Sequence, residues 1–456
     1  MIAWEDRETS TVLLAPPSPP GAPHLGGIYT WALLDVARRT AHHFGGAAHL
    51  PQSWNMSSRR LEPTFGDDPE GFARYCQRAV DNAVSTLAGF GIVVSPHAAL
   101  RDDDASVRAH VQAIVTELAN RDVVRYLAAE EKWCLSCRIA LPPSAATEHC
   151  FTCENPLRLR TTRDWFLPVD LDEVFRRAAT VEWVPGFGIR RLRSLIDVHP
   201  LIRVGHPQRN LGVPSPLHDG EILDPRLVAA LGPSLLRRLG LNGPIVAAAG
   251  FDIQRKWLLT LLATNQPGAL PTMIVQHGTL LDTAGRKLSR YTGASLADAP
   301  ADVEPCLVRA ALLSSPLGKD FRAVALPTVG ASRLREKVLN SLRYIGLQQP
   351  RTGGIDLDAE CDEWFNEVES HLRNFDISRA YAGFQRAILS VSSTLIPMIR
   401  RQGIASFAAT CRRIVSLHGV FYGDDPRLPG TPAGLEPLDA DGRDAAQVRA
   451  PDRDPS

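Results

Sequence analysis

The stretch from residue 10 to 52 constrains the fold most, because it reads as strand, glycine-containing loop, helix and strand in turn. The run STVLLA (10–15) predicts a short buried strand that ends at a proline-rich loop. A helix over 30–44 and a second strand at AAHLPQ (47–52) follow it. This order is typical of the start of a doubly wound parallel sheet that binds a nucleotide.

The loop PPGAPHLGG (19–27) places His24, Gly26 and Gly27 at the mouth of that helix. A helix N-terminus presents unpaired N–H groups and the positive end of the macrodipole, which suits a phosphate. Glycines let a ligand approach the backbone, and a histidine can donate to a phosphoryl oxygen. Two interpretations stay open here: a phosphate site, or a loop whose histidine only caps the helix.

The remainder of the chain predicts more elements of the same kind. The runs GPIVAAAGFD (243–252) and PTMIVQHG (271–278) predict buried strands with a helix between them. Apolar residues at helical spacing predict helices over 69–90 and 104–120, and the pattern between about 125 and 215 breaks into the short strands and turns of an insertion. The sequence from 296 to 422 is predicted to be helical, and the Pro-, Gly-, Asp- and Ala-rich end of the chain to be disordered.

Composition limits the class of protein. A chain of 456 residues predicts two to four domains, and 44% hydrophobic with 22% charged residues is ordinary globular composition. No apolar run approaches about 18 residues, and MIAWEDRETS is acidic and polar, so we expect neither a transmembrane helix nor a signal peptide. Fifty basic residues balance fifty acidic ones, which gives no general attraction to nucleic acid. A cytoplasmic protein is expected.

Four of the eight cysteines form the pairs CLSC (134–137) and CFTC (150–153). Two such turns at this separation can place four thiolates tetrahedrally around Zn²⁺, whereas chance pairing or a redox pair is the alternative. A closed site of four cysteines leaves no open position for catalysis, so its role is to fold the insertion. The predicted ligands are Cys134, Cys137, Cys150 and Cys153.

The segment DTAGRKLSRYTGAS (282–295) carries Lys287 and Arg290 within a glycine-bounded loop. Because only five of the fifty basic residues are lysines, a lysine at this place is more informative than usual. Mobile cations here can stabilise charge that develops on a polyphosphate, and a solvated surface turn is the alternative. A histidine loop after the first strand and a basic loop after the last strand would face each other across the sheet's carboxyl edge.

Taken together, these features resemble class I aminoacyl-tRNA synthetases, and methionyl-tRNA synthetases most closely. PHLGG (23–27) stands where that family has its HIGH signature, and KLSRY (287–291) where it has KMSKS. The resemblance runs from about 10 to 425, through both cysteine pairs, LIRVGHPQRNLGVPSP (201–216) and VQHGTLLDTAGRK (275–287). It implies an α/β fold: a Rossmann-like parallel sheet, split by a zinc-knuckle insertion and followed by an α-helical bundle.

The resemblance also implies a division into five parts. These are a first catalytic half (1–107), a connective insertion with the zinc knuckle (108–215), a second catalytic half (216–295), a helical bundle like an anticodon-binding domain (296–424) and a disordered tail (425–456).

For the nucleotide, the resemblance assigns residues one by one. His24 would stabilise the transition state at the α-phosphate, and Lys287 and Arg290 would act on the pyrophosphate. Gly250 with Asp252 falls at the ribose, and His277 with Gly278 at the adenine. The full set expected to bind ATP, which enters with Mg²⁺, is Pro17, His24, Gly26, Gly27, Gly250, Asp252, His277, Gly278, Lys287, Ser289 and Arg290.

The sequence departs from the family mainly at the amino-acid pocket. Gly27 replaces the last histidine of HIGH, and Tyr291 the final serine of KMSKS. In the pocket Ser18 replaces a tyrosine, Asn55 an aspartate that binds the substrate's ammonium, and Trp257 a histidine. Losing a charge-assisted partner costs about 1.5–3 kcal/mol, so we expect methionine to be a poor substrate. Alternatively, the match at Asn55 is off by a residue or two, and a nearby carboxylate serves instead.

The activity implied is that of an AMP-forming ligase: an amino-acid carboxylate attacks ATP, and the aminoacyl group then passes to an acceptor, tRNA by resemblance. One alternative is a natural-product enzyme that passes a different amino acid to a small-molecule amine or hydroxyl. Another is a catalytically inactive binding paralogue. Asn340 and Arg343 lie near the family's anticodon-reading positions, although their spacing does not match. ATP and an amino acid are the expected partners, with no membrane, and a monomer is favoured.

Overall fold

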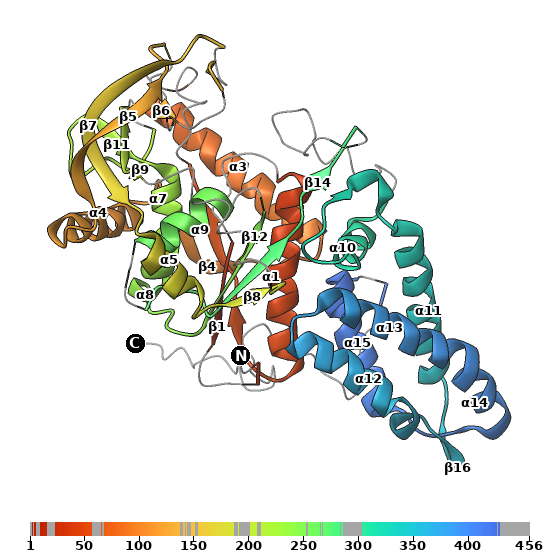
Figure 1. Cartoon of the computed structure of the whole chain (residues 1–456). Helices are drawn as coiled ribbons and strands as arrows, with labels where there is room; N and C mark the ends of the chain where they lie inside the picture. Colours follow the sequence, from red (N-terminus) through yellow and green to blue (C-terminus); the bar gives the residue numbers. More distant parts are fainter. Residues whose placement is uncertain are drawn as a thin grey trace, which may run out of the picture. The chain divides into compact units, whose positions relative to one another are not determined.

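The structure is a computed structural model whose contacts divide the chain into two compact units, Met1–Leu326 and Pro327–Ser456, described separately below (Figure 1). The residues it describes are 2, 4–5, 10–15, 23–56, 65, 68–136, 140–141, 143, 147–150, 154–186, 190, 201–207, 211–251, 254–264, 266, 268–282, 284–285, 303–425 and 427–428.

A five-stranded parallel sheet forms the centre of the first unit, in the order β2-β1-β12-β13-β8. Helices cover both faces of such a sheet, which explains why its main strands read as unbroken apolar runs rather than alternating ones. Every residue of β12 is buried. The strands are β1 Thr11–Leu14, β2 Ala48–His49, β8 Glu182–Val184, β12 Ile245–Gly250 and β13 Met273–His277.

The predicted strand–helix–strand order is confirmed on both sides of the sheet. Helix α1 (Leu25–His43) connects β1 to β2, and α9 (Gln254–Ala263) connects β12 to β13. Helix α1 begins five residues before the predicted start at residue 30, because its N-cap is His24 within the glycine loop. The predicted strand at 47–52 proves to be two, since the chain changes partners at Leu50. After it, β3 (Pro51–Trp54) pairs with β4 (Ser95–Arg101) instead of β1.

The helices predicted at 69–90 and 104–120 are α3 (Pro69–Gly89) and α4 (Ala105–Asn120). Aspartates cap both of them: Asp68 accepts from Gly71 N, and Asp104 accepts from Ser106 N and Val107 N. Apolar residues of α4 share one core with β1, β12, α9 and two short helices, α7 (Pro225–Ala230) and α8 (Gly232–Arg238).

The region expected to be an insertion builds an antiparallel sheet in the order β6-β5-β7-β9. Its chain returns to give β8, the edge strand of the parallel sheet, so the range 108–215 contains a strand of the main sheet. The elements here are β5 Arg125–Trp133, β6 Ala140–Leu141, β7 Arg158–Pro168, α5 Leu171–Ala178, β9 Leu201–Arg203, β10 Gly205–Pro207 and β11 Glu221–Leu223.

After β13, the first unit continues through β14 (Leu280–Leu281), α10 (Pro305–Leu313), β15 (Phe321–Arg322) and the 3-10 turn Ala323–Ala325. The second unit is helical, as predicted, and also holds a short parallel pair, β16 with β17, that the sequence did not suggest. Its elements are α11 Thr328–Gly346, β16 Pro350–Asp356, α12 Leu357–Arg373, α13 Ile377–Ser390, the π-helical turn Val391–Leu395, α14 Ile396–Gln402, β17 Ile404–Ser406 and α15 Ala408–Tyr422.

Contacts place α10 in the first unit, although the helical bundle is expected to begin at residue 296. The other predicted boundaries stay predictions, and the predicted tail lies outside the described residues from 429 onward. None of the helices described is both long and apolar enough to span a bilayer.

A buried carboxylate fastens α1 to its neighbours. Asp35 accepts from Arg39 Nε at 2.8 Å, from Arg38 Nη2 at 2.7 Å and from Arg309 Nη1 of α10 at 2.7 Å. Arg39 Nη2 also donates to Gly91 O at 2.8 Å, beyond the end of α3. Burial alone would raise the pKa of Asp35, but the three arginines outweigh it and hold that pKa well below its usual range. Burial lowers the pKa of Arg309 to about 10, so both groups are charged at neutral pH.

We predict that Asp35→Asn lowers the free energy of unfolding by about 3–5 kcal/mol, because it leaves the buried guanidinium of Arg309 without its carboxylate. Urea unfolding measures this loss. The control Asp81→Asn, on an exposed surface of α3, should change stability by less than about 0.5 kcal/mol. Since the pKa of Asp35 is depressed on folding, its contribution is present above about pH 4 and is lost as the pH falls below that value. Equal losses in the two variants would contradict the assignment.

Candidate functional site

The carboxyl edge of the parallel sheet gathers most of the described residues that were predicted to bind ATP. Gly250, the last residue of β12, lies opposite His277, the last residue of β13. His24 caps α1, the helix that follows β1. Carboxyl ends of parallel strands meet at one edge, where open α/β sheets bind their ligands. His24, Gly26, Gly250 and His277 therefore belong to a single region of the structure.

His24 caps the helix, and the capping bond decides which ring nitrogen carries the proton. Its Nδ1 accepts from Gly27 N at 3.3 Å. In the neutral ring the proton is then on Nε2, which makes that nitrogen a donor. The two interpretations left open by the sequence are thus compatible.

The two glycines of this loop differ in what they require. A Cβ on Gly26 would come within 3.0 Å of His24 Cε1, so a side chain at residue 26 would displace the ring. A Cβ on Gly27 would meet, among the described atoms, only Pro23 Cβ, at 4.0 Å. Sterics thus explain the glycine at 26 but give no reason for the one at 27.

A buried hydrogen bond links the start of α1 to the end of β13. Thr30 Oγ1 lies 2.8 Å from His277 Nε2 and 3.3 Å from Gly26 O. His277 Nδ1 lies 2.8 Å from Gly278 O, and because a carbonyl only accepts, Nδ1 is the donor there. The ring of Tyr29 packs beside the imidazole with a centroid separation of 4.6 Å. Sequence reasoning missed Thr30 and Tyr29, since neither belongs to the signature.

Gly278 follows β13 directly and lies where the backbone of Lys319 passes very close to it. A Cβ there would lie 1.9 Å from Lys319 O, so only glycine fits. Beside it, Thr279 N donates to Asp320 Oδ1 at 2.6 Å. The close crossing places the residues just before β15 against the end of β13.

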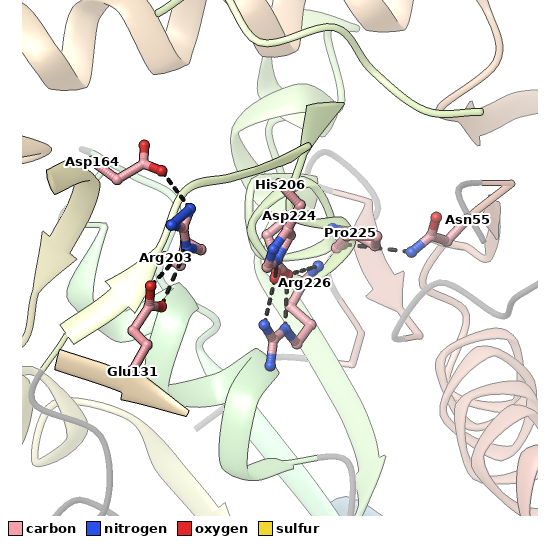
Figure 2. Close-up of polar contacts among 8 residues, drawn as sticks. All are labelled: Asn55, Glu131, Asp164, Arg203, His206, Asp224, Pro225 and Arg226. Carbon is pink, nitrogen blue, oxygen red and sulfur yellow. Dashed lines mark hydrogen bonds and ion pairs between the residues drawn. The ribbon is translucent and has the colours of Figure 1, made fainter. Parts of the chain in front are cut away.

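The two described candidates for the amino-acid pocket both contact α7. Asn55 Nδ2 lies 3.5 Å from Pro225 O, and the indole nitrogen of Trp257 donates to Ala229 O at 3.0 Å (Figure 2 for Asn55). Trp257 is 2% exposed and belongs to the main core. Beside Asn55, Met56 N donates to the buried carboxylate of Asp102 at 2.5 Å. The carboxylate of Asp102 therefore contacts the residue that follows Asn55, and the assignment of Asn55 to the pocket stays a prediction.

Asp224 is the hub of a charged cluster at the start of α7. Its carboxylate accepts from Arg226 N at 2.8 Å, from Arg226 Nε at 2.7 Å and from His206 Nε2 at 2.5 Å, and it also pairs with Arg226 Nη2. Figure 2 shows both side chains converging on it. Burial opposes the charge, but Arg226 and His206 hold the pKa of Asp224 well below its ordinary value. Asp-Pro before an apolar run is an N-cap signal that could have located this residue.

A second charged cluster lies in the antiparallel sheet (Figure 2). Arg203 of β9 pairs with Asp164 of β7 and, at 3.2 Å, with Glu131 of β5. Thr162 Oγ1 donates to Glu131 Oε2 at 2.7 Å. The members of this cluster lie on β5, β7 and β9, three of the four strands of that sheet, so the cluster stabilises the insertion.

Half of the predicted zinc knuckle is described. Cys134 and Cys150 are buried in one small cluster, and Asn155 Nδ2 donates to Ser136 Oγ at 2.9 Å, which brings the two C-x-x-C turns together. Cys137 and Cys153 lie outside the described residues. No cluster of three or more His, Cys, Asp or Glu able to hold a metal occurs within the described ranges. The zinc site stays a prediction.

Several other predicted site residues also lie outside the described residues. They are Pro17, Ser18, Asp252, Lys287, Ser289, Arg290 and Tyr291.

No protein-family model matches the chain. In sequence it is 33% identical over 89 residues to the isoleucine–tRNA ligase of Thermotoga neapolitana, a match that covers 18% of this chain and 10% of the ligase. The chain is 29% identical over 90 residues to the isoleucine–tRNA ligase of Kosmotoga olearia, a match that covers 17% of this chain and 10% of that ligase. The chain thus matches about a tenth of the length of these curated relatives.

Similarity in fold extends much further. Two structures of Mycobacterium tuberculosis methionyl-tRNA synthetase with methionyl-adenylate each superpose on this chain with a TM-score of 0.67. Each match covers 90% of this chain and 89% of the synthetase, at 15% and 16% identity. The predicted fold class and the resemblance to class I aminoacyl-tRNA synthetases are confirmed.

We predict that Thr30→Val lowers the free energy of unfolding by about 1–3 kcal/mol, because it keeps the shape of the side chain but leaves His277 Nε2 without its partner in a buried place. The matched control is Thr40→Val on the same helix. Thr40 is fully buried, and its hydroxyl has no hydrogen-bond partner within the described part of the chain. Denaturant unfolding of both variants decides: a loss in Thr40→Val as large as in Thr30→Val would show that the hydrogen bond is not what matters.

Proposed function

We propose that the chain activates an amino acid with ATP, forming an aminoacyl-adenylate and pyrophosphate, and passes the aminoacyl group to an acceptor. The observation that carries this proposal is the shared fold with a synthetase bound by methionyl-adenylate, combined with His24, Gly26 and His277 at the carboxyl edge. Ligands of open α/β sheets bind at that edge, and the N-terminus of α1 supplies the N–H groups and positive dipole that a phosphate needs.

In the proposed reaction a carboxylate oxygen of the amino acid attacks the α-phosphorus of ATP, which enters as its Mg²⁺ complex. The bond from that phosphorus to the bridging oxygen breaks, and pyrophosphate leaves with the electron pair. No proton has to move, so positioning and charge stabilisation carry the catalysis. His24 Nε2 donates to the α-phosphate, and Gly26 leaves room for the ring. Lys287 and Arg290 act on the pyrophosphate, as the resemblance implies.

We propose that the amino acid is not methionine. Asn55, where the resemblance places an aspartate, is a neutral residue that can hydrogen-bond an ammonium but cannot offset its charge. The indole N–H of Trp257 is engaged by Ala229 O. A different or modified amino acid, with the carboxylate of Asp102 bound to the neighbouring Met56 N, fits these residues better.

For the acceptor we propose tRNA, on the basis of the fold, with a small-molecule amine or hydroxyl as the second candidate. The changed residues at the pocket favour the second candidate, since an enzyme of a separate pathway has no need to keep methionine. Asn340 and Arg343 are both exposed on α11, where a nucleic acid can reach them.

We also propose a structural Zn²⁺ held by Cys134, Cys137, Cys150 and Cys153. It is supported by the burial of Cys134 and Cys150 in one cluster and by the bond between Asn155 and Ser136. Bound there, the metal would supply folding energy to the insertion.

ATP–pyrophosphate exchange against a panel of amino acids tests the activity. We expect exchange with at least one polar or N-modified amino acid, and methionine to fall below a kcat/KM of about 10⁴ M⁻¹s⁻¹, the lower end of the usual enzyme range. His24→Ala and Lys287→Ala should lower kcat at least about tenfold with little change in ATP affinity, because their contacts strengthen in the transition state.

Three outcomes would count against this proposal. ATP binding without exchange on any amino acid would favour the inactive paralogue. Efficient activation of methionine would refute the changed specificity, and full exchange by both variants would refute the assigned motifs. Aminoacylation of total tRNA, run beside the exchange, separates the two acceptors.

Metal analysis of the purified protein tests the zinc proposal. We predict about one Zn²⁺ per chain, and loss of that zinc in Cys134→Ser and Cys150→Ser, since a structural site needs all four ligands. Cys76→Ser is the control, because Cys76 is a buried thiol of α3 outside the two pairs and should leave the zinc content unchanged. Protein that is free of zinc and folded would overturn the proposal.

A further inference from the structure

We infer that Asp224 is a positioning residue for the amino-acid side of the site, acting through the short helix α7. Its carboxylate fixes the helix, and two carbonyls of the helix fix Asn55 and Trp257. The inference rests on the proposed function, because Asn55 and Trp257 serve a substrate only if the chain activates an amino acid.

Asp224 is well anchored by its own backbone. Its N–H donates to Val204 O at 2.7 Å, and the preceding Leu223 N donates to Val213 O at 2.8 Å. The residue follows β11, which pairs with β10 in an antiparallel pair. The carboxylate, at 1% exposure, therefore has a defined place before α7 begins.

From this position the carboxylate of Asp224 accepts hydrogen bonds from two elements, α7 and β10. Toward α7 it accepts from the backbone and guanidinium of Arg226, at 2.8 and 2.7 Å. Toward β10 it accepts from His206 Nε2 at 2.5 Å. One negative charge thus ties the first turn of α7 to the neighbouring strand pair.

α7 depends on this cap more than a longer helix would. It has six residues, so few of its backbone groups can pair within the helix, and short helices take their stability from their surroundings. A change at the cap therefore moves the whole helix rather than fraying one end.

The side chains that a shift of α7 would displace lie on the proposed amino-acid side of the site. Asn55 meets α7 at Pro225 O, 3.5 Å away, and Trp257 meets it at Ala229 O, 3.0 Å away. On the nucleotide side, His24 and His277 are held by their own hydrogen bonds to Gly27 N and Thr30 Oγ1. A disturbed α7 should weaken amino-acid binding and spare ATP binding.

Two substitutions separate the cap from the charge. Asp224→Asn retains an oxygen for Arg226 N but removes the negative charge, whereas Asp224→Ala removes both. In exchange assays with the amino acid that gives the fastest wild-type exchange, we expect KM for that amino acid to rise about tenfold in the first variant and further in the second. KM for ATP and kcat should stay within about threefold.

Glu131→Gln is the matched control, because it disturbs a different buried carboxylate–arginine cluster of the same unit, one that includes β5. It should lower the melting temperature and leave both KM values unchanged. A parallel rise of both KM values in the Asp224 variants, or an equal rise for the amino acid in Glu131→Gln, would show that Asp224 is merely structural.

Hydrogen–deuterium exchange gives a readout that needs no substrate. Because it uses Asp224→Asn, it still tests the inference if Asp224→Ala folds poorly. In Asp224→Asn, amides of 226–230 should exchange faster, and amides of α1 should not change. Unchanged exchange in α7 would overturn the inference. If the wild type activates no amino acid at all, the proposed function fails, while this measurement still decides whether Asp224 holds α7.

Discussion

The buried charge of Asp35 is the constraint on which the proposed nucleotide side of the site depends. A carboxylate without solvent is costly unless it is paired, and here three arginines pair with it. Two come from α1 itself, and Arg309 comes from α10, more than two hundred residues further along the chain. Because Asp35 lies in the middle of α1, the position of His24 at the N-terminus is set from inside the helix as well as by the loop before it.

A second buried carboxylate, Asp224, likewise anchors a helix, on the proposed amino-acid side of the site. Asp35 fixes a long helix that begins at the sheet's carboxyl edge, and Asp224 fixes a short one that carries two contacts to the proposed pocket. Each pairs with arginine, whose fixed planar fork suits a buried carboxylate. Because the two helices have separate anchors, the amino-acid side can change without loss of the nucleotide side. This arrangement agrees with a chain that keeps the fold of a synthetase while its pocket residues differ.

A fold shared at 15% identity means that this architecture tolerates other residues at most positions. In this chain it is built from unbroken apolar strands, a capped helix after the first strand and a glycine at a close crossing. Gly278 shows the last of these, since any side chain there would collide with Lys319 O. Asn55 and Trp257, the residues of the proposed pocket, instead contact α7 through their side-chain nitrogens. Steric demand at the backbone therefore explains Gly278, whereas side-chain contacts position the proposed pocket residues.

Sequence alone determined the elements whose causes are local. Runs of buried residues predicted the main strands, helical spacing predicted α3 and α4, and the histidine–glycine loop indicated a helix N-terminus, because hydrophobic period and capping depend on residues a few positions apart. Only the tertiary structure decided which distant groups meet. It placed β8 in the main sheet, Thr30 against His277, Arg309 on Asp35 and His206 on Asp224. The physical reason is that the partner of a buried polar group is whichever group packing brings within about 3 Å, and no local pattern encodes that distance.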